Sequence, residues 1–246
     1  MEFIFPDETM EDLALKGLRL IKPSKGFRYG TDQVLLADFA QARPHSLVCD
    51  LGAGSGILTL LLVGRAEGLR VEALEYDAVQ VDRMRRCIQL NGLGDSVSVA
   101  QGDIREIKQH RAAGRFQMVI CNPPYHAKED AQDMPEVERA ARTEWGCDYA
   151  DVCCAAKWLL RNKGRLVTMC PARRMAEMFA ALSKNGLEVK RLRLVQASAE
   201  KPPYLCLIEA MKGAKPGLRI EPVLVLSRHG EMTAEVKNIY HIKEQP

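Results

Sequence analysis

The stretch from Asp50 to Gly56 reads DLGAGSG and decides the fold of this chain. It follows an apolar run at residues 46–51, which is typical of a buried strand, and it precedes an apolar stretch from Ile57 that is typical of a helix. Glycines spaced G-x-G-x-G allow a tight strand-to-helix turn in which the backbone approaches a ligand closely. A dinucleotide-binding fingerprint needs glycine or alanine where Ile57 stands, so that fingerprint fails here.

Strands and helices alternate along the chain on both sides of this turn. We expect further strands at 70–75, 96–100, 116–121 and 164–170, and helices from 57 onward and at 78–91, 150–161 and 173–185. Such alternation predicts a doubly wound α/β fold. Two late strands, 188–196 and 204–211, are joined too briefly for a parallel crossover. The expected sheet is therefore mostly parallel and seven-stranded, with a C-terminal antiparallel hairpin.

Two segments flank this core. Residues 1–45 are expected to form a basic extension, with a strand or hairpin at 18–21 and a helix at 31–42, packed on a domain of residues 46–246. The tail after Gly213 predicts one late strand at 218–226 and a short helix.

The composition is that of an ordinary soluble protein. The 246 residues are 47% hydrophobic and 27% charged, which suits one α/β domain with a small appendage. No uncharged apolar stretch approaches the roughly 18 residues of a spanning helix, and no signal peptide is visible. The eight cysteines form no C-x-x-C pair, so we expect a reducing, cytoplasmic setting without a metal site.

Three acidic residues follow the first three core strands. S-adenosylmethionine carries a sulfonium and an ammonium but no phosphate, so a carboxylate such as Asp50 at a strand end suits it. Glu75 ends the second strand, where an acid can accept hydrogen bonds from both ribose hydroxyls. Asp103 can accept from an adenine amine while Ile104 packs on the ring. Together these positions predict S-adenosylmethionine as the cofactor.

Residues 122–125 read NPPY directly after the fourth strand and form the most specific motif. An aromatic amine is a poor nucleophile because its lone pair is delocalised into the ring. Two acceptors that form hydrogen bonds with its two N–H groups favour a more pyramidal nitrogen. Asn122 offers a side-chain carbonyl and Pro123 a backbone carbonyl. The two prolines restrict the backbone and so preorganise both carbonyls. Tyr125 offers a face on which a flipped base can stack. The motif predicts methyl transfer to a planar amino group, with Asn122, Pro123 and Tyr125 as the catalytic residues.

These motifs, together with FRYGTDQVLL at residues 27–36, resemble the family of tRNA(Val) adenine-N6-methyltransferases. The resemblance runs from about Leu18 to Met211. It implies a Rossmann-like class I methyltransferase fold and methylation of the adenine beside the anticodon, tRNA position 37. By this likeness residues 28–32 close over the methionine end of the cofactor. The cofactor-binding residues that we expect are Tyr29, Gly30, Thr31, Asp50, Gly52, Gly54, Gly56, Glu75, Tyr76, Asp103, Ile104 and Asn122.

Two basic stretches favour a phosphate-bearing partner. Residues 16–28 carry five basic residues and no acid, and residues 157–193 carry ten against two acids. We expect RNA, most readily tRNA, to contact Lys22, Lys25, Arg28, Arg173 and Arg174.

Other acceptors of a methyl group stay open. A glutamine amide is also a planar amine, so a protein glutamine N-methyltransferase acting on a release factor fits the NPPY motif. An rRNA base amino-methyltransferase fits it too. A DNA adenine methyltransferase usually needs a target-reading domain, for which little chain is left.

Overall fold

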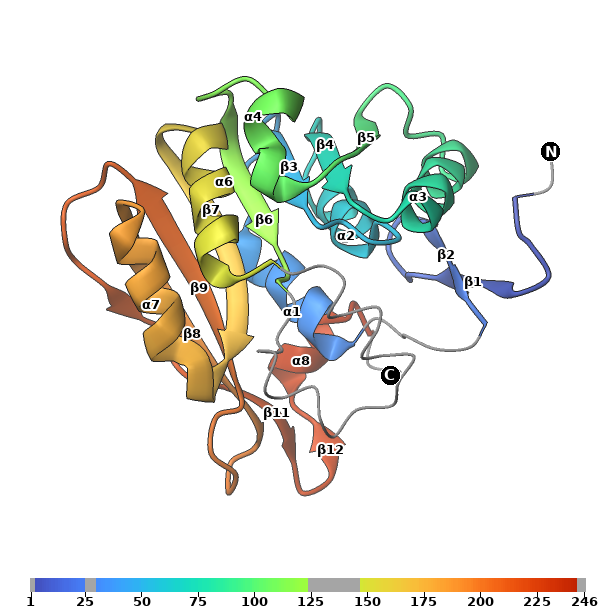
Figure 1. Cartoon of the computed structure of the whole chain (residues 1–246). Helices are drawn as coiled ribbons and strands as arrows, with labels where there is room; N and C mark the ends of the chain where they lie inside the picture. The colour runs from blue at the N-terminus through green and yellow to red at the C-terminus, as the bar shows by residue number, and fades with distance from the viewer. Residues whose placement is uncertain (1–2, 25–29, 124–146, 243–246) are drawn as a thin grey trace, which may run out of the picture.

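A computed structural model describes residues 3–24, 30–123 and 147–242. Its core is a ten-stranded sheet of order β12-β11-β8-β9-β7-β6-β3-β4-β5, with β10 paired to β8 (Figure 1). The seven expected strands form the body of this sheet, and they are β3 (Leu47–Leu51), β4 (Arg70–Glu75), β5 (Val97–Gln101), β6 (Phe116–Cys121), β7 (Leu160–Pro171), β8 (Leu187–Ser198) and β9 (Leu205–Lys212).

The first five of these strands are parallel, whereas β9 is antiparallel to both of its neighbours, β7 and β8. The expected mostly parallel sheet with a C-terminal hairpin is therefore confirmed. The parallel strands all end at one edge of the sheet, which we call the carboxyl edge, and begin at the opposite amino edge. Ligands bind outside the carboxyl edge in folds of this kind.

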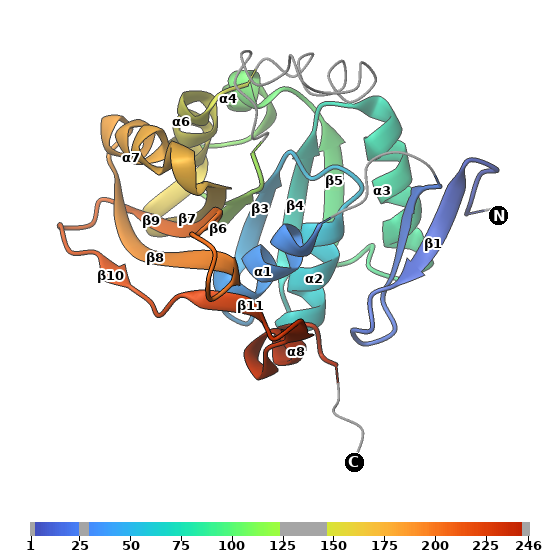
Figure 2. The same cartoon turned by 90° about the horizontal axis from the view of Figure 1, so that it is seen from below.

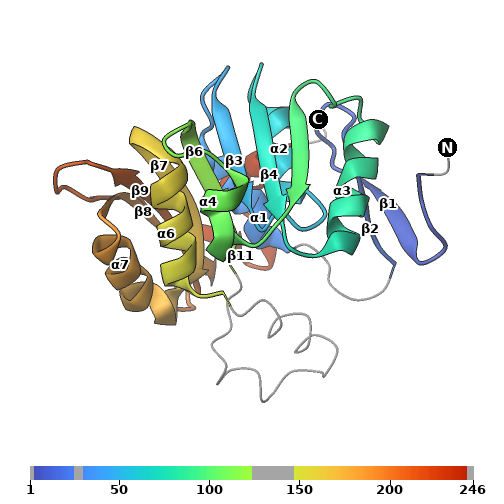
Figure 3. The same cartoon turned by 45° about the horizontal axis from the view of Figure 1, so that its top comes forward.

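Helices cover both faces of the sheet (Figure 3). Each set of helices packs on an apolar cluster of buried residues. One cluster lies under α1 (Thr31–Ala40), α2 (Ile57–Arg65) and α3 (Ala78–Leu90), and the other under α4 (Ile107–His110), α6 (Tyr149–Leu159) and α7 (Met175–Lys184). Local signals set the starts of these helices. Asp77 accepts from the amide of Val79 at the start of α3, and Asp148 forms a capping box with Asp151 in α6.

An N-terminal hairpin, β1 (Glu8–Asp12) and β2 (Arg19–Pro23), forms a separate antiparallel sheet beside α3 (Figure 2). The buried carboxylate of Glu8 accepts from Arg83 Nε at 2.9 Å and from Arg86 Nη1 at 2.6 Å. The amide of Ile21 donates to the thiol of Cys87. These contacts fix the hairpin on the helix, while the domain division at residue 45 stays a prediction.

The tail differs from the single late strand that the sequence predicted. It forms β10 (Arg219–Ile220), β11 (Leu224–Arg228), β12 (Glu231–Met232) and the expected short helix, α8 (Ala234–Ile239). Both β10 and β11 run parallel to β8. Pro222 lies between them, and proline has no N–H to donate to a sheet ladder, so it interrupts the strand. The tail thus lengthens the sheet beyond its seven core strands.

None of the helices in the described ranges has the length and apolar character that crossing a membrane requires.

Candidate active site

The glycine turn after β3 needs its glycines for their backbone conformation. Gly52, Gly54 and Gly56 have φ angles of 69°, 55° and 91°, in the left-handed region where a side chain is strained. A Cβ at Gly56 would also lie 3.0 Å from the side chain of Met84. The amide of Gly52 donates to the carbonyl of Leu74, which anchors the turn on β4.

Asp50 lies beneath this turn and is fully buried. Its Oδ2 accepts from the Thr59 hydroxyl of α2 at 2.7 Å, while its Oδ1 has no hydrogen-bond partner among the described residues. Burial raises the pKa of the Asp50 carboxyl to about 6. A buried acceptor without a partner is rare in folded proteins, so Oδ1 is suited to a donor or cation brought by a ligand.

Glu75 ends β4 and is also fully buried. Its Oε2 accepts from the amide of Gly54 at 2.7 Å, and its Oε1 accepts from the amide of Asp77 at 2.9 Å. Burial raises the pKa of Glu75 to about 7. Each carboxylate oxygen has a second lone pair that can accept a further hydrogen bond.

A pocket lies at the carboxyl edge between β3, β4, β5 and β6. Five predicted residues line it, namely Gly52, Tyr76, Asp103, Ile104 and Asn122. Asp103 accepts from both Nε and Nη2 of Arg105, and these hydrogen bonds lower its pKa. An adenine amine that uses Asp103 would therefore share the carboxylate with Arg105.

Asn122 follows β6 at the wall of this pocket. Its Oδ1 is buried and has no hydrogen-bond partner in the described part of the chain, and the neighbouring Pro123 is buried as well. An unpaired amide carbonyl in a pocket is an acceptor for a ligand N–H. Pro124 and the predicted stacking residue Tyr125 lie outside the described residues.

The structure describes residues 30–32 of the predicted methionine-end segment. The amide of Gly30 donates to Gln33 Oε1 at 2.9 Å, and Thr31 begins α1. Neither residue is among those that line the pocket. Asp32 accepts from the phenol of Tyr204, which joins α1 to the β8–β9 turn at 3.2 Å. Tyr29 lies outside the described residues.

The predicted RNA contacts are dispersed. Lys22 pairs with Glu11 within the N-terminal hairpin. Arg174 pairs with Glu177 at 2.5 Å and lies 4.4 Å over the ring of Tyr149. Arg173 is exposed in the 3-10 turn directly after β7, at the same edge as Asn122. Lys25 and Arg28 lie outside the described residues.

The sequence analysis did not predict several residues of this region. Thr59 is the one hydroxyl in the apolar run that forms α2, and that exception was a usable signal. Cys147 and Val152 line the same pocket as Asp103, but they are distant in sequence and carry no motif. Tyr204 follows two prolines, yet only the folded chain brings it to Asp32.

The strand order, the glycine turn after β3 and the pocket beside it define a class I methyltransferase. Residues 25–185 match the methyltransferase small domain family. A relative in Cronobacter sakazakii, the tRNA1(Val) (adenine(37)-N6)-methyltransferase, is 30% identical over 183 residues, which cover 74% of each chain.

Solved structures share the fold at low identity. A predicted O-methyltransferase of Agrobacterium tumefaciens matches 85% of this chain and 95% of its own at a TM-score of 0.70 and 20% identity. Geranyl diphosphate C-methyltransferase of Streptomyces coelicolor A3(2), solved with S-adenosyl-L-homocysteine, matches 74% of this chain and 77% of its own, with a TM-score of 0.54 and 16% identity.

The chain therefore belongs to the methyltransferase small domain family, and the expected family resemblance is confirmed. S-adenosylmethionine is its cofactor, as the sequence predicted.

Proposed function

We propose that this protein transfers a methyl group from S-adenosylmethionine to the N6 amine of adenine 37 in tRNA1(Val). The curated relatives that carry this activity in their names cover about three quarters of the chain and are matched over a similar share of their own length. The adenine in these names carries a planar N6 amine, which is the kind of acceptor that the motif at residues 122–125 predicts.

One observation carries this proposal. The Oδ1 atom of Asn122 is buried without a partner in the described residues, beside a pocket that also holds Gly52 and Asp103. An exocyclic amine that donates one N–H to Asn122 and another to the carbonyl of Pro123 would satisfy this acceptor. As the nitrogen bonds to the methyl group it gains positive charge, and both carbonyl dipoles stabilise that charge more than they stabilise the free amine.

The buried acids would hold the cofactor, which supplies an electrophilic methyl group on a sulfonium. Glu75 would accept from the ribose hydroxyls, and Asp103 together with Ile104 would hold the adenine. Asp50 would stabilise the cationic methionine end through its Oδ1. No strong base is required, because the amine loses its proton readily once it carries the methyl group.

Mass spectrometry of tRNA nucleosides tests this function in cells. Deletion of the gene should remove N6-methyladenosine from tRNA1(Val), and the wild-type gene should restore it. A copy that carries Asn122→Ala is the matched control and should not restore it. If the modification persists after deletion, another enzyme makes it. N-methylglutamine lost from a release factor would indicate the glutamine acceptor instead.

A further inference from the structure

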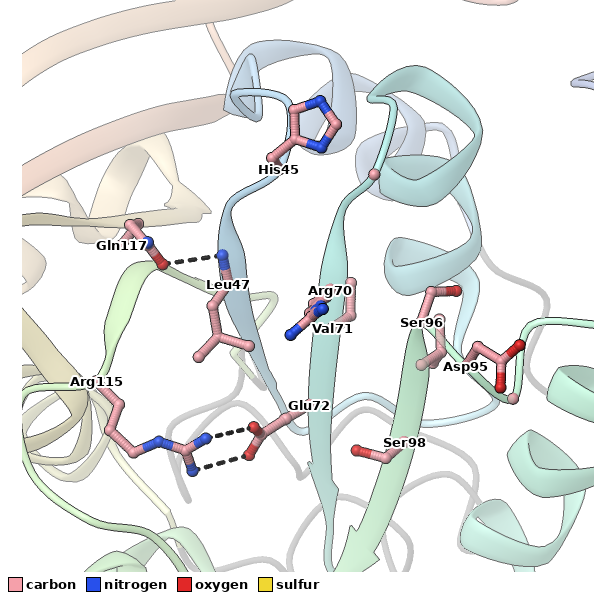
Figure 4. Close-up of a pocket in the computed structure, with 13 residues that line it drawn as sticks. His45, Leu47, Arg70, Val71, Glu72, Asp95, Ser96, Ser98, Arg115 and Gln117 are labelled. Atoms are coloured by element: carbon pink, nitrogen blue, oxygen red, sulfur yellow. Dashed lines mark hydrogen bonds and ion pairs between the residues drawn. The ribbon is translucent and has the colours of Figure 1, made fainter.

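A basic groove runs along the amino edge of the sheet, opposite the active site. It consists of two adjoining hollows of about 450 Å³ and 210 Å³ that share His45 and Gln117 in their walls. Figure 4 shows the larger hollow below His45, with Arg70 at the start of β4 and Arg115 directly before β6, on either side of β3. We call the two hollows together the amino-edge groove.

The charges in this groove are mostly positive. Two acids line it, Glu72 and Asp95, against six basic residues, which are Arg43, Arg70, Arg115, Arg161, Lys163 and Arg165. Glu72 is already shared by Arg115 at 2.9 Å and Arg111 at 3.2 Å, as the dashed contacts to Arg115 in Figure 4 illustrate. A net positive charge therefore remains along the groove.

Three of the arginines have side chains without a partner among the described residues. Arg165 pairs with Glu209, and Lys163 donates to the carbonyl of Gly213. By contrast, Arg43, Arg70 and Arg161 are exposed, and within the described ranges their guanidinium groups form no hydrogen bond or ion pair. Guanidinium groups bind phosphate through two parallel hydrogen bonds, which makes these three well suited to phosphate.

The shape of the groove fits a polymer better than a single phosphate. Its walls draw on β5, β4, β3, β6 and β7, and adjacent strands lie about 4.8 Å apart, so the groove extends roughly 20 Å. Several phosphates of one strand can lie along that length. The exposed hydroxyl of Ser98 adds a neutral donor on the same wall.

We infer that the amino-edge groove binds the phosphate backbone of the RNA substrate at a distance from the methylated base. This inference rests on the proposed RNA methyltransferase function. The strand β4 separates the two edges by five residue steps of about 3.3 Å, or roughly 17 Å. Helices about 10 Å thick cover both faces of the sheet, so the path around them is longer than this straight distance. We therefore expect a full-length tRNA held at the carboxyl edge to contact the groove more extensively than an isolated anticodon stem-loop does.

The test compares two RNAs and two triple variants. The groove variant is Arg43→Gln, Arg70→Gln and Arg161→Gln. The control variant removes the same charge from exposed positions elsewhere, with Arg85→Gln, Lys184→Gln and Arg228→Gln. Dissociation constants for the full-length tRNA and for its anticodon stem-loop are measured across a series of salt concentrations, alongside unfolding by denaturant.

The groove variant should bind full-length tRNA about tenfold more weakly, and the slope of log K against log salt should flatten by about 0.7–0.9 for each phosphate that is no longer bound. Its affinity for the stem-loop and its kcat at saturating tRNA should not change. The control variant should match the wild type. If the triple variant is unstable, the single variant Arg70→Gln gives a smaller change of the same kind.

Unchanged tRNA affinity and salt slope in the groove variant would overturn the inference. An equal loss for tRNA and stem-loop would also overturn it, because the effect would then be unspecific. The proposed function is tested apart from this, by the methylated product of the wild type. A wild type that binds tRNA but leaves adenine 37 unmodified refutes the proposed function. The RNA-binding role of the groove is still tested by the comparison of the two variants.

Discussion

The two edges of the sheet carry polar groups of opposite character. At the carboxyl edge, Asp50 and Glu75 are buried acids whose oxygens are aimed by Thr59 and by backbone amides. At the amino edge, Arg43 and Arg70 are exposed, and their side chains are unpaired within the described residues. Electrostatic interactions are strong where water is excluded and weak where it is not. The carboxyl edge therefore suits specific chemistry on a small cofactor, and the amino edge suits salt-sensitive binding of a polyanion.

The largest effect should come from Asn122→Ala. It removes a preorganised acceptor that acts mainly in the transition state, and such a loss typically costs about 10²–10³ in turnover. Single-turnover kinetics with saturating S-adenosylmethionine would measure it, and tRNA affinity should change little. A variant that methylates at the normal rate would refute the role of Asn122 and weaken the argument for an amine acceptor.

The fold was readable from the sequence because its signals are local. The bounds of β4 and β6 were predicted to the residue, as the glycine turn was. The split of the tail strand at Pro222 was missed because two short strands and one longer strand leave similar apolar patterns.

The site was only partly readable for a different reason. Asn122, Asp103 and Gly52 each follow a strand, and strand order brings them to one pocket. Thr59, Cys147 and Tyr204 contribute through contacts that only the folded chain creates. The amino-edge groove combines Arg43, Arg70 and Arg161, which come from three separate loops or strand starts. No single basic stretch of the sequence contains all three, so the sequence does not predict the groove.

A second effect at the carboxyl edge concerns Glu75. Glu75→Ala removes a charged acceptor from the ribose hydroxyls, and hydrogen bonds to charged groups are worth roughly 1.5–3 kcal/mol. Calorimetry should show a corresponding loss of S-adenosylmethionine affinity. Glu75→Gln, which keeps the shape and a neutral acceptor, should lose less. Equal affinity in wild type and Glu75→Ala would show that the ribose binds elsewhere.

The smallest effect should come from Thr59, which acts through Asp50. Thr59→Val removes the hydroxyl that donates to Asp50 Oδ2 and that lowers the pKa of this carboxyl. Cofactor affinity at pH 7 should fall by less than in Glu75→Ala. The pH range over which the affinity rises should shift to higher pH. Thr59→Ser keeps the hydroxyl and should restore the wild-type profile. A uniform loss at every pH would indicate a packing role only.

The pH dependence of stability should run opposite to that of cofactor binding. The pKa values of Asp50 and Glu75 are raised to about 6 and about 7 in the folded chain, so the folded state binds these protons more tightly than the unfolded state. Their contribution to the free energy of unfolding is therefore present below about pH 4 and is lost as pH rises toward 7. Cofactor affinity, which needs the ionised acids, should rise over about pH 6–7, and denaturant titrations with calorimetry compare the two.

The most direct test of the account is methyl transfer with purified components. Full-length tRNA1(Val) is incubated with this protein and S-adenosylmethionine that carries an isotope-labelled methyl group, and the product is digested and mapped by mass spectrometry. One label per tRNA should appear on N6 of adenine 37, and a tRNA with guanine at that position should stay unlabelled. A label on another nucleotide, on a ring nitrogen, or only on an added release factor would contradict the account.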